Sequence, residues 1–358
     1  MKTNIKGNSI GICVSKGEYI GLCNLIEKRI HFVPEDVTFI RFKQDDIDFE
    51  NRSVKGEKFR KDIEDWVDGI FPFPDVVYIQ CTISLDKIKK IENIIGPYVF
   101  NSFIFNKWEG WKLLNNSWRL RKHLPKTQLI KDIGEFFDFI NKNKFNDIII
   151  KPINGYSSEG IYRIRLQGGN NIKVSSRQGE TIKDQVFINY SQLSSFIESK
   201  IYSESHIVQQ TIDTVKINEN VIDIKMHMTR DYKGNWQVSL LLFRIANNNS
   251  MIIPTNITAY NMEQFIKSPI YNKAIMTDIE DSIKSLGFKI CKSFDKSKYH
   301  IGDISIDLGL DYEGKLWIFE VNPLPFPTRG STGEYPLKRP IEYALYLASR
   351  KNQFNLWV

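Results

Sequence analysis

Residues 303–322, DISIDLGLDYEGKLWIFEVN, predict two β-strands joined by a tight turn. Polar and apolar residues alternate strictly along both halves of this stretch, as expected when one face of each strand is buried. In the second half the alternation places Ile318 on the same face as Glu320. Between the strands, Glu313-Gly314 suits a two-residue hairpin turn that needs positive φ.

The register of this hairpin brings two carboxylates together. If Tyr312 pairs with Lys315, then Asp307 lies directly opposite Glu320, with about 5 Å between their Cβ atoms. Asn322 lies one pleat further along the same face. Like charges held so close destabilise a hairpin unless a cation lies between them, and two carboxylates with an amide oxygen suit a hard ion such as Mg²⁺. The alternative is a solvated hairpin face, which the alternation alone does not exclude.

Composition and charge narrow the class of protein. The chain has 358 residues, enough for two or three domains, and its 25% charged and 42% hydrophobic residues are ordinary for a globular protein. The net charge of +7 favours anionic ligands such as nucleotides. Lys and Arg are spread along the sequence, and no stretch resembles a signal peptide or a membrane span. We therefore expect a cytoplasmic protein without a nucleic-acid or membrane partner.

The cysteines and histidines do not suggest a transition-metal site. The four cysteines lack the pairwise spacing of metal ligands and have no histidine nearby; they are Cys13, Cys23, Cys81 and Cys291. The five histidines form no metal-spaced pair either. The sequence therefore predicts reduced, mostly buried thiols, and a zinc enzyme is not expected.

The order of predicted elements indicates a small α/β domain followed by a larger α+β region. In the first hundred residues we expect strands at Ile10–Val14 and Val76–Gln80, and helices at Lys55–Val67 and Leu85–Ile95. The rest of the chain predicts helices alternating with antiparallel strands. The expected helices cover 107–115, 133–143, 191–200, 276–294 and 340–350, and the expected strands 147–151, 161–166, 207–210, 223–230 and 236–244.

Two lysines are placed to bind phosphate. Lys151 ends a buried strand, and the following loop, 154–160, offers backbone N–H groups and hydroxyls that suit a phosphate. Lys107 opens a helix, where it is able to meet the same phosphates. Taken alone, an ordinary hairpin with a solvated lysine is the simpler interpretation.

Further polar positions are compatible with a nucleotide. The strand 207–210 runs into a polar bend whose backbone and amide groups suit the edge of an adenine, while Asp213 suits a ribose hydroxyl. The same residues also serve as an ordinary strand exit. Lys225 and Arg244 are cations at strand positions that are able to face an anion, although surface strands carry such residues routinely.

The order of these motifs resembles the ATP-grasp superfamily, and their wording resembles its YheC/YheD branch, described as spore-coat-associated. The resemblance runs from about Asn101 to the C-terminus and extends to the N-terminal PDVVY (74–78). The matching segments are FNKWEGWKLL (105–114), LRKHLPKT (120–127), IKPING (150–155), GIYRI (160–164), IVQQ (207–210), GDISID (302–307) and WIFEVN (317–322).

The resemblance implies a fold and domain limits. The fold is α+β: an ATP-grasp fold, whose two α+β subdomains sandwich ATP, preceded by a small α/β N-terminal domain. The implied limits are 1–100 for the N-terminal domain and 101–358 for the ATP-grasp domain, with a subdomain boundary near 206–213.

The resemblance also implies a role for each site residue, and these roles are expectations. The phosphates would be bound by Lys107, Lys151 and a loop containing Gly155, Ser157, Ser158 and Gly160. The adenine and ribose would be held by Gln209, Gln210, Ile212 and Asp213. Two Mg²⁺ ions would be held by Asp307, Glu320 and Asn322. The γ-phosphate and the acyl phosphate formed from it would be faced by Lys225, Arg244 and Asn256.

The activity implied is that of an ATP- and Mg²⁺-dependent carboxylate–amine ligase, which forms an amide or peptide bond through an acyl phosphate and releases ADP and phosphate. Its partners would be ATP, a carboxylate and an amine acceptor. The alternatives are a nucleotide-binding spore-coat protein without turnover and a small-molecule kinase on the same fold. The chain departs from the branch at Lys225, where Arg is usual, at the bulky Tyr156, and in 247–260, which lacks paired glycines.

Overall fold

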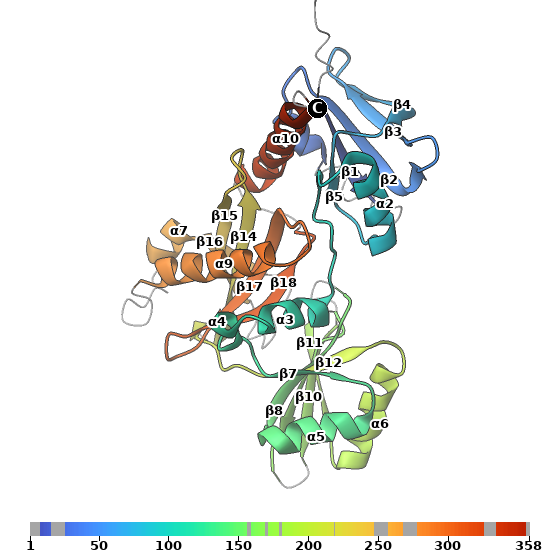
Figure 1. Cartoon of the computed structure of the whole chain (residues 1–358). Helices are drawn as coiled ribbons and strands as arrows, with labels where there is room; N and C mark the ends of the chain where they lie inside the picture. Colours follow the sequence, from blue (N-terminus) through green and yellow to red (C-terminus); the bar gives the residue numbers. More distant parts are fainter. Residues whose placement is uncertain are drawn as a thin grey trace, which may run out of the picture.

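The computed structural model describes residues 8–15, 26–155, 159–168, 171–178, 181–217, 219–246, 257–267, 278–325 and 334–355. Figure 1 shows three sheets arranged one after another along the molecule, with the N-terminal sheet at one end. The sheet that carries the 303–322 hairpin lies in the middle, between the other two.

The first sheet combines parallel and antiparallel pairing. Its inner strands β2, β1, β5 and β6 are parallel, whereas β2, β3 and β4 form an antiparallel meander. The strands run in the order β4-β3-β2-β1-β5-β6 and are β1 (Ser9–Val14), β2 (Thr38–Asp48), β3 (Ser53–Arg60), β4 (Asp65–Pro72), β5 (Val76–Ile79) and β6 (Val99–Phe100). Helix α2 (Leu85–Ile95) begins after Ser84, whose hydroxyl accepts a hydrogen bond from the N–H of Lys87.

The helix predicted for Lys55–Val67 is wrong, because this stretch forms the antiparallel strands β3 and β4. Trp66 lies opposite Phe59 across the pair, with ring centroids 5.4 Å apart, and also packs 6.1 Å from the ring of Phe39 on β2. Cross-strand aromatic contacts of this kind stabilise a sheet, and a local periodicity does not reveal them.

The second sheet is antiparallel throughout and is covered by two helices. Its strand order is β11-β10-β9-β8-β12-β7, and Figure 1 shows α5 and α6 packed beside it. The strands are β7 (Thr127–Ile130), β8 (Asp147–Pro152), β9 (Tyr162–Leu166), β10 (Ile172–Gln178), β11 (Thr181–Phe187) and β12 (His206–Gln210), and the helices are α5 (Ile133–Asn143) and α6 (Tyr190–Ile201). Apolar residues from both helices and from the strands form one core, including Phe136, Ile148, Leu193 and Val208.

The third sheet, in the order β16-β15-β14-β17-β18, forms the centre of the molecule, and the short β13 pairs with β14. Its strands are β13 (Lys216–Ile217), β14 (Asn220–Arg230), β15 (Trp236–Ala246), β16 (Ile257–Asn261), β17 (Asp303–Leu310) and β18 (Leu316–Asn322). The accompanying helices are α3 (Lys107–Asn115), α4 (Trp118–Arg121), α7 (Met262–Lys267) and α9 (Ile279–Asp295). The start predicted for α9, Met276, lies outside the described residues.

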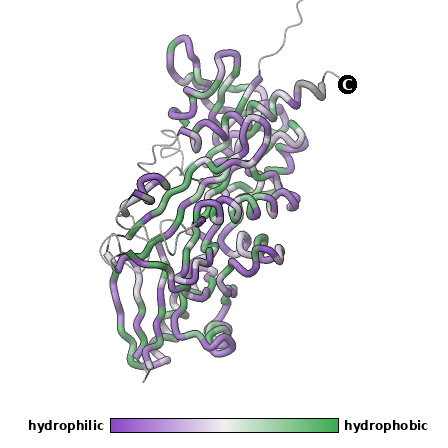
Figure 2. Tube along the Cα trace, turned by 90° about the vertical axis from the view of Figure 1, so that its left-hand side faces the viewer, coloured by the Kyte–Doolittle hydropathy of each residue, from purple (hydrophilic) through white to green (hydrophobic). Residues whose placement is uncertain are grey.

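The last helix, α10 (Tyr335–Asn355), packs against the N-terminal sheet and so brings the two ends of the chain together. It is longer than the predicted 340–350, and it contributes Ile341, Ala344 and Ala348 to the core beside β1 and β5. The proposed domain limits remain predictions, but this packing ties the C-terminal helix to the N-terminal sheet. Figure 2 shows apolar stretches running along the interior strands and polar stretches at turns.

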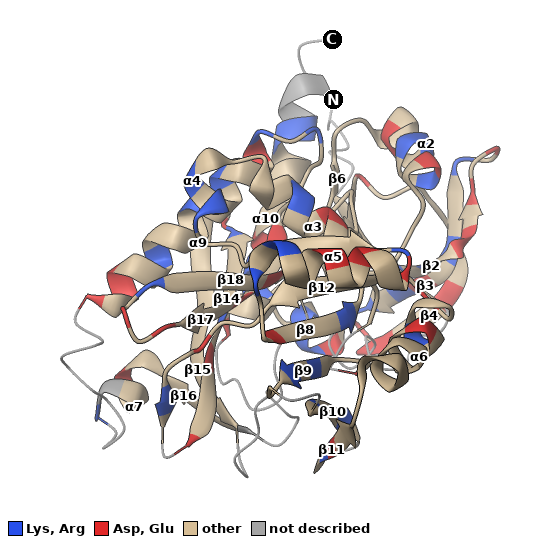
Figure 3. Ribbon diagram, turned by 90° about the horizontal axis from the view of Figure 1, so that it is seen from below, with Lys and Arg blue, Asp and Glu red and all other residues tan. Residues whose placement is uncertain are grey.

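The surface carries both signs of charge, and Figure 3 shows Lys and Arg interspersed with Asp and Glu over the helices. Among the described residues no helix is long and apolar enough to cross a membrane. The cysteines described, Cys13, Cys81 and Cys291, are buried free thiols, as predicted; Cys23 lies outside the described residues.

Candidate functional site

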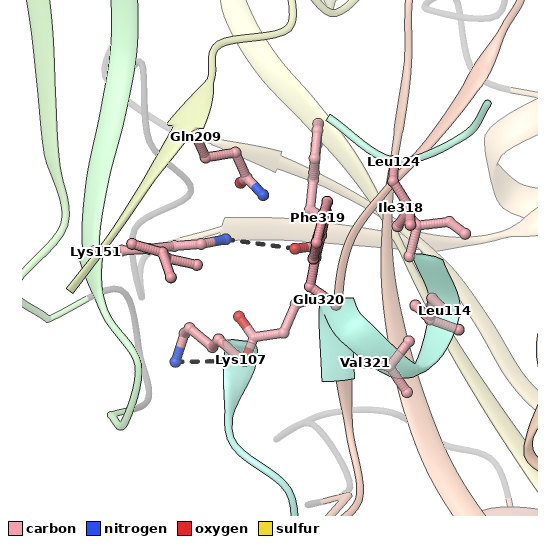
Figure 4. A pocket seen from close by; sticks show the side chains of 11 residues that line it. Lys107, Leu114, Leu124, Lys151, Gln209, Ile318, Phe319, Glu320 and Val321 are labelled. Carbon is pink, nitrogen blue, oxygen red and sulfur yellow. Dashed lines mark hydrogen bonds and ion pairs between the residues drawn. The ribbon is translucent and has the colours of Figure 1, made fainter. Parts of the chain in front are cut away.

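A pocket lies where the second and third sheets face each other (Figure 4). Lys151 and Gln209 reach it from β8 and β12, Glu320 reaches it from β18, and Lys107 enters from the start of α3. The remaining lining residues are mostly apolar: Trp111, Leu114, Leu124, Ile207, Ile318, Phe319 and Val321. An apolar slot with convergent charged groups is typical of a small-molecule site.

Lys107 is fixed at the first position of α3 by a capping box. The side chain of Asn106 accepts from the N–H of Glu109, and the carboxylate of Glu109 accepts from the N–H of Asn106. The Nζ of Lys107 donates to the carbonyl oxygen of Gly155 at 2.6 Å and lies 3.5 Å from Oε1 of Glu320. Lys107 therefore connects the loop after β8 to the hairpin of β17 and β18.

Lys151 is buried at the end of β8, with 5% of its surface exposed. Its Nζ donates to the carbonyl oxygen of Phe319 at 3.4 Å (Figure 4). Burial lowers the pKa of Lys151 to about 8, the negative charge of Glu320 opposes this shift, and the positive charge of Lys107 adds to it. The ammonium of Lys151 is therefore buried beside a second cation, Lys107, and an anion bound between them would stabilise its charged form.

If Lys151 binds ATP, as the resemblance implies, ATP affinity should fall as the pH rises through about 8, because the unliganded Lys151 loses its charge there. The binding constant should weaken by up to about tenfold per pH unit above that value. Calorimetric titration with Mg²⁺-ATP between pH 7 and about 9.5 measures this. Lys151→Arg keeps its charge over the same range, so its affinity should stay constant. A flat profile for the unmodified protein would contradict the assignment.

The loop after β8 depends on glycine at two positions. Gly155 has φ 116° and Gly160 has φ 70°, both in the region that side chains disfavour. A Cβ at Gly160 would also lie 3.1 Å from Cγ of Pro152. Ser157 and Ser158, which we predicted to bind phosphate, lie outside the described residues.

The strand β12 places only the first of its predicted nucleotide residues in the pocket. Gln209 is buried, lines the pocket and donates from Nε2 to Oγ1 of Thr127 at 2.8 Å. Gln210 instead lies against Lys126, and its Oε1 accepts a hydrogen bond from the backbone N–H of Lys126 at 3.3 Å. Ile212 and the exposed Asp213 follow the strand without lining the pocket. Their roles toward adenine and ribose remain predictions.

The register of the 303–322 hairpin is confirmed, but its turn differs from the prediction. Asp307 pairs with Glu320, as expected. The turn is a three-residue loop closed by Asp311, with positive φ at Gly314 only. The extra loop residue shifts the pairing by one, and a bulge at Phe319 shifts it back.

The bulge also changes which side chains share a face. Ile318 is buried in the core with Val321, so the predicted placement of Ile318 beside Glu320 is wrong. Glu320 keeps 27% of its side chain exposed and turns toward the pocket instead. Because the bulge adds one residue, the strict alternation expected for this strand ends at Phe319.

Asp307 accepts hydrogen bonds from two cations. Its carboxylate lies 3.0 Å from Nζ of Lys225 and 2.9 Å from Nη2 of Arg244. Burial raises the pKa of Asp307, but the charges of Lys225 and then Arg244 outweigh burial and hold it below its usual value. Asn256, the third predicted catalytic residue, lies outside the described residues.

Asp223 contacts the predicted site residue Arg244, and the sequence analysis does not include it among the site residues. It pairs with Arg244 across β14 and β15, and its carboxylate accepts two hydrogen bonds from that guanidinium, from Nε at 2.7 Å and from Nη2. Burial raises the pKa of Asp223, and the charge of Arg244 counters this. Asp223 orients Arg244 toward Asp307. Its sequence signal was weak, because the partnership exists only once the two strands pair.

The hairpin fits a magnesium ion. Asp307 and Glu320 offer carboxylates from directly paired positions, and Mg²⁺ needs few protein oxygens. Asn322 accepts from the N–H of Leu324 at 2.8 Å, which leaves its amide oxygen one lone pair. Within the described ranges no three His, Cys, Asp or Glu side chains group as a metal site, so a third protein oxygen would come from this amide.

These sheets form an ATP-grasp fold, and solved structures share it. The VanG D-Ala:D-Ser ligase from Enterococcus faecalis has a TM-score of 0.59 and 13% identity, over 96% of this chain and 99% of that one. The D-alanyl-alanine synthetase A of Vibrio cholerae has a TM-score of 0.58 and 14% identity, over 97% and 99%. At such identities the likeness shows the fold alone.

The chain belongs to the YheC/D-like ATP-grasp family, whose model matches residues 96–347. Two curated relatives come from Bacillus subtilis (strain 168). The endospore coat-associated protein YheD is 26% identical over 85% of this chain and 69% of its own length. The endospore coat-associated protein YheC is 20% identical over 81% of each. The predicted family and fold are confirmed, and membership implies ATP-dependent chemistry of the ligase type.

Proposed function

We propose that this protein is an ATP- and Mg²⁺-dependent carboxylate–amine ligase that forms an amide or peptide bond. The observation that carries the proposal is the pairing of Asp307 with Glu320. Lysine and arginine side chains surround the two carboxylates, and their positive charges are suited to the negative charge of a triphosphate. Lys107 lies beside Glu320, and Lys225 and Arg244 hold Asp307. Such pairing suits a site that binds phosphates and a metal ion together. The lysine and arginine side chains then exchange carboxylates for phosphates, and the carboxylates exchange these cations for the metal ion.

The reaction would run in two balanced steps. A carboxylate oxygen of the acid attacks the γ-phosphorus of ATP, the bond to the β-phosphate oxygen breaks, and ADP leaves. The amine nitrogen then attacks the acyl carbon, phosphate leaves with the bonding electron pair, and the amine loses a proton. When bound, Mg²⁺ supplies positive charge to the β- and γ-phosphate oxygens.

The side chains of this chain would bind and orient the reactants. Lys107 and Lys151 hold the α- and β-phosphates, and the apolar pocket side chains together with Gln209 hold the adenine. Lys225 and Arg244 face the transferred phosphoryl group, where their fixed charges stabilise the transition state. Asp223 keeps the guanidinium of Arg244 in place.

An assay of ADP and phosphate release tests the proposal. The protein is incubated with ATP, Mg²⁺ and pools of amino acids and short peptides, and each pool is repeated without the amine component. Release that requires both a carboxylate and an amine supports the ligase. ADP formation that needs no amine indicates a kinase on the same fold.

The names of the two curated relatives mention the endospore coat, and this motivates a second candidate, a nucleotide-binding protein of the spore coat that performs no turnover. Measurable ATP binding without turnover in any pool would favour this candidate over the ligase. A spore-associated location is part of the same proposal, and localisation of a tagged protein during sporulation tests it.

A further inference from the structure

Four polar groups form a chain of hydrogen bonds beside the pocket, and we name it the amide chain. Nε2 of Gln209 donates to Oγ1 of Thr127 at 2.8 Å, and the hydroxyl of Thr127 donates to the carbonyl oxygen of Pro125 at 3.0 Å. Nε1 of Trp111 donates to the same carbonyl oxygen at 3.2 Å. The amide chain therefore joins two residues that line the pocket, Gln209 and Trp111.

The pairing of β7 with β12 places two members of the amide chain side by side. Gln209 lies directly opposite Thr127, and opposite residues of antiparallel strands point to the same face of the sheet. On the other side of β12, Ile207 lies opposite Lys151 of β8, and Gln209 follows Ile207 by two residues. The amide of Gln209 and the ammonium of Lys151 therefore share the face that lines the pocket (Figure 4).

The amide chain fixes which end of the Gln209 side chain is left for a ligand. A carbonyl oxygen only accepts, so the single hydroxyl hydrogen of Thr127 is committed to Pro125. Oγ1 of Thr127 can then only accept, which identifies the nitrogen of the amide as the end that donates to it. Oε1 of Gln209 remains, and within the part of the chain that the structure describes it accepts no hydrogen bond.

The opposite orientation of this amide is less favourable. With the amide turned over, Oε1 of Gln209 would take the hydroxyl hydrogen of Thr127, and Pro125 would keep only the bond from Trp111. The turned state has one hydrogen bond fewer, and Thr127 and Gln209 are only 8% and 4% exposed, so little water is at hand to replace it. One such bond favours the observed orientation by roughly 2- to 10-fold.

A cross-strand contact between polar side chains also occurs where it only stabilises a sheet. That role explains the bond between Gln209 and Thr127, but it makes no use of Oε1 of Gln209. The ammonium of Lys151, on the same face, donates to the carbonyl oxygen of Phe319 instead. An acceptor that is held without a donor in a mostly apolar pocket selects ligands that bring an N–H group.

We propose that Thr127 is a positioning residue, which makes the pocket select the 6-amino group of adenine against the 6-oxo group of hypoxanthine and guanine. The inference rests on the proposed function, in which Gln209 and the apolar side chains of the pocket hold the base. The amino group of adenine is a donor and pairs with Oε1 of Gln209, whereas a 6-oxo group brings a second acceptor against it. Thr127 acts only through Gln209.

Calorimetric titration with Mg²⁺-ATP and Mg²⁺-ITP tests the selection, because hypoxanthine carries an oxygen where adenine carries the amino group. We expect ATP to bind about 10- to 100-fold more tightly than ITP, since ITP loses one hydrogen bond and leaves two acceptors facing each other. The triphosphate of purine riboside, which has only hydrogen at position 6, should bind with intermediate affinity. Equal affinities for ATP and ITP would overturn the inference, and this measurement needs no variant.

Substitutions of Thr127 connect the selection to the amide chain. Thr127→Val removes the hydroxyl and keeps the shape of the side chain, so the amide of Gln209 is able to present either end. The ratio of ATP to ITP affinity should then fall roughly 3- to 10-fold. Thr127→Ser keeps a hydroxyl and should keep the ratio. In Thr127→Val/Gln209→Glu the carboxylate offers only acceptors, so the selection should return without Thr127.

Thr181→Val is the matched control, because the hydroxyl of Thr181 also donates to a backbone carbonyl oxygen, that of Gln178 at 3.1 Å, at the exposed start of β11. It should change neither affinity. If Thr127→Val weakens ATP and ITP by the same factor and leaves their ratio unchanged, Thr127 has a structural role only, and the inference is overturned.

Binding separates this inference from the ligase proposal, because it needs no turnover. Selection for ATP that Thr127→Val reduces supports the inference even where no acid and amine are joined, and then only the ligase proposal fails. Amide formation by a protein that binds ATP and ITP equally overturns the inference and leaves the ligase proposal standing. A protein that binds neither nucleotide overturns both.

Discussion

Replacing Glu320 with Gln is expected to lower Mg²⁺-dependent ADP release by about 10²–10³-fold while the protein stays folded. The amide keeps the shape of the side chain but removes one of the two paired carboxylates on the hairpin. The proposed metal site would then lose a charged oxygen, and Lys107 loses the carboxylate that lies 3.5 Å from its Nζ. ADP release measured against Mg²⁺ concentration gives the effect, and circular dichroism checks the fold.

The same substitution has an opposite expected effect on metal-free ATP. Glu320 repels the triphosphate when no Mg²⁺ is bound, so Glu320→Gln should bind ATP in EDTA more tightly than the unmodified protein does. The matched control is Glu313→Gln, on the exposed turn of the same hairpin, which should change neither quantity. Unaltered Mg²⁺ dependence in Glu320→Gln would refute the metal assignment.

The hairpin shows how far local reasoning from the sequence reaches. The pairing of Asp307 with Glu320 was predicted from a two-residue turn, but the turn has three residues and the register is restored by the bulge at Phe319. The prediction was right in its result because the two deviations cancel. A sequence specifies which faces are polar, whereas a bulge depends on packing against neighbouring strands.

The other errors have a related cause. The stretch Lys55–Val67 has a local period compatible with a helix, and only the pairing of β3 with β4 makes it a hairpin. Asp223 and Phe319 were missed because each acts through a partner distant in sequence, Arg244 and Lys151 respectively. Lys107 and Lys151 were singled out by weak local signals that only the resemblance made into a prediction, and the structure brings both to one pocket.

The charges of the proposed site form one connected set. Asp307 forms ion pairs with Lys225 and Arg244. It also lies opposite Glu320, which forms an ion pair with Lys107, so that Asp307 joins the two groups of charges. A charge removed from such a set leaves its partners buried and unpaired, which costs more than the lost contact itself. Substitutions here should therefore affect stability and activity together, more strongly than at any exposed ion pair.

Arg244→Gln is the substitution for which we expect the largest combined effect. Arg244 compensates two carboxylates, the buried Asp223 and Asp307, so its loss should destabilise the protein by about 3–5 kcal/mol. Phosphoryl transfer should also slow by about 10²–10³-fold, because the fixed positive charge that we propose to face the γ-phosphate is lost. Urea unfolding measures the first effect, and ADP release at a temperature where the variant is folded measures the second.

A second substitution separates structural from catalytic loss. In Asp223→Asn/Arg244→Gln the buried carboxylate is neutral, so part of the stability should return while activity stays low. Arg163→Gln is the matched control: Arg163 makes a similar two-pronged ion pair with Asp147 on the second sheet and its side chain is similarly buried, so its loss should destabilise the protein without slowing phosphoryl transfer. If the double variant regained activity together with stability, Arg244 would be a structural residue, and the charge facing the γ-phosphate would have to come from Lys225.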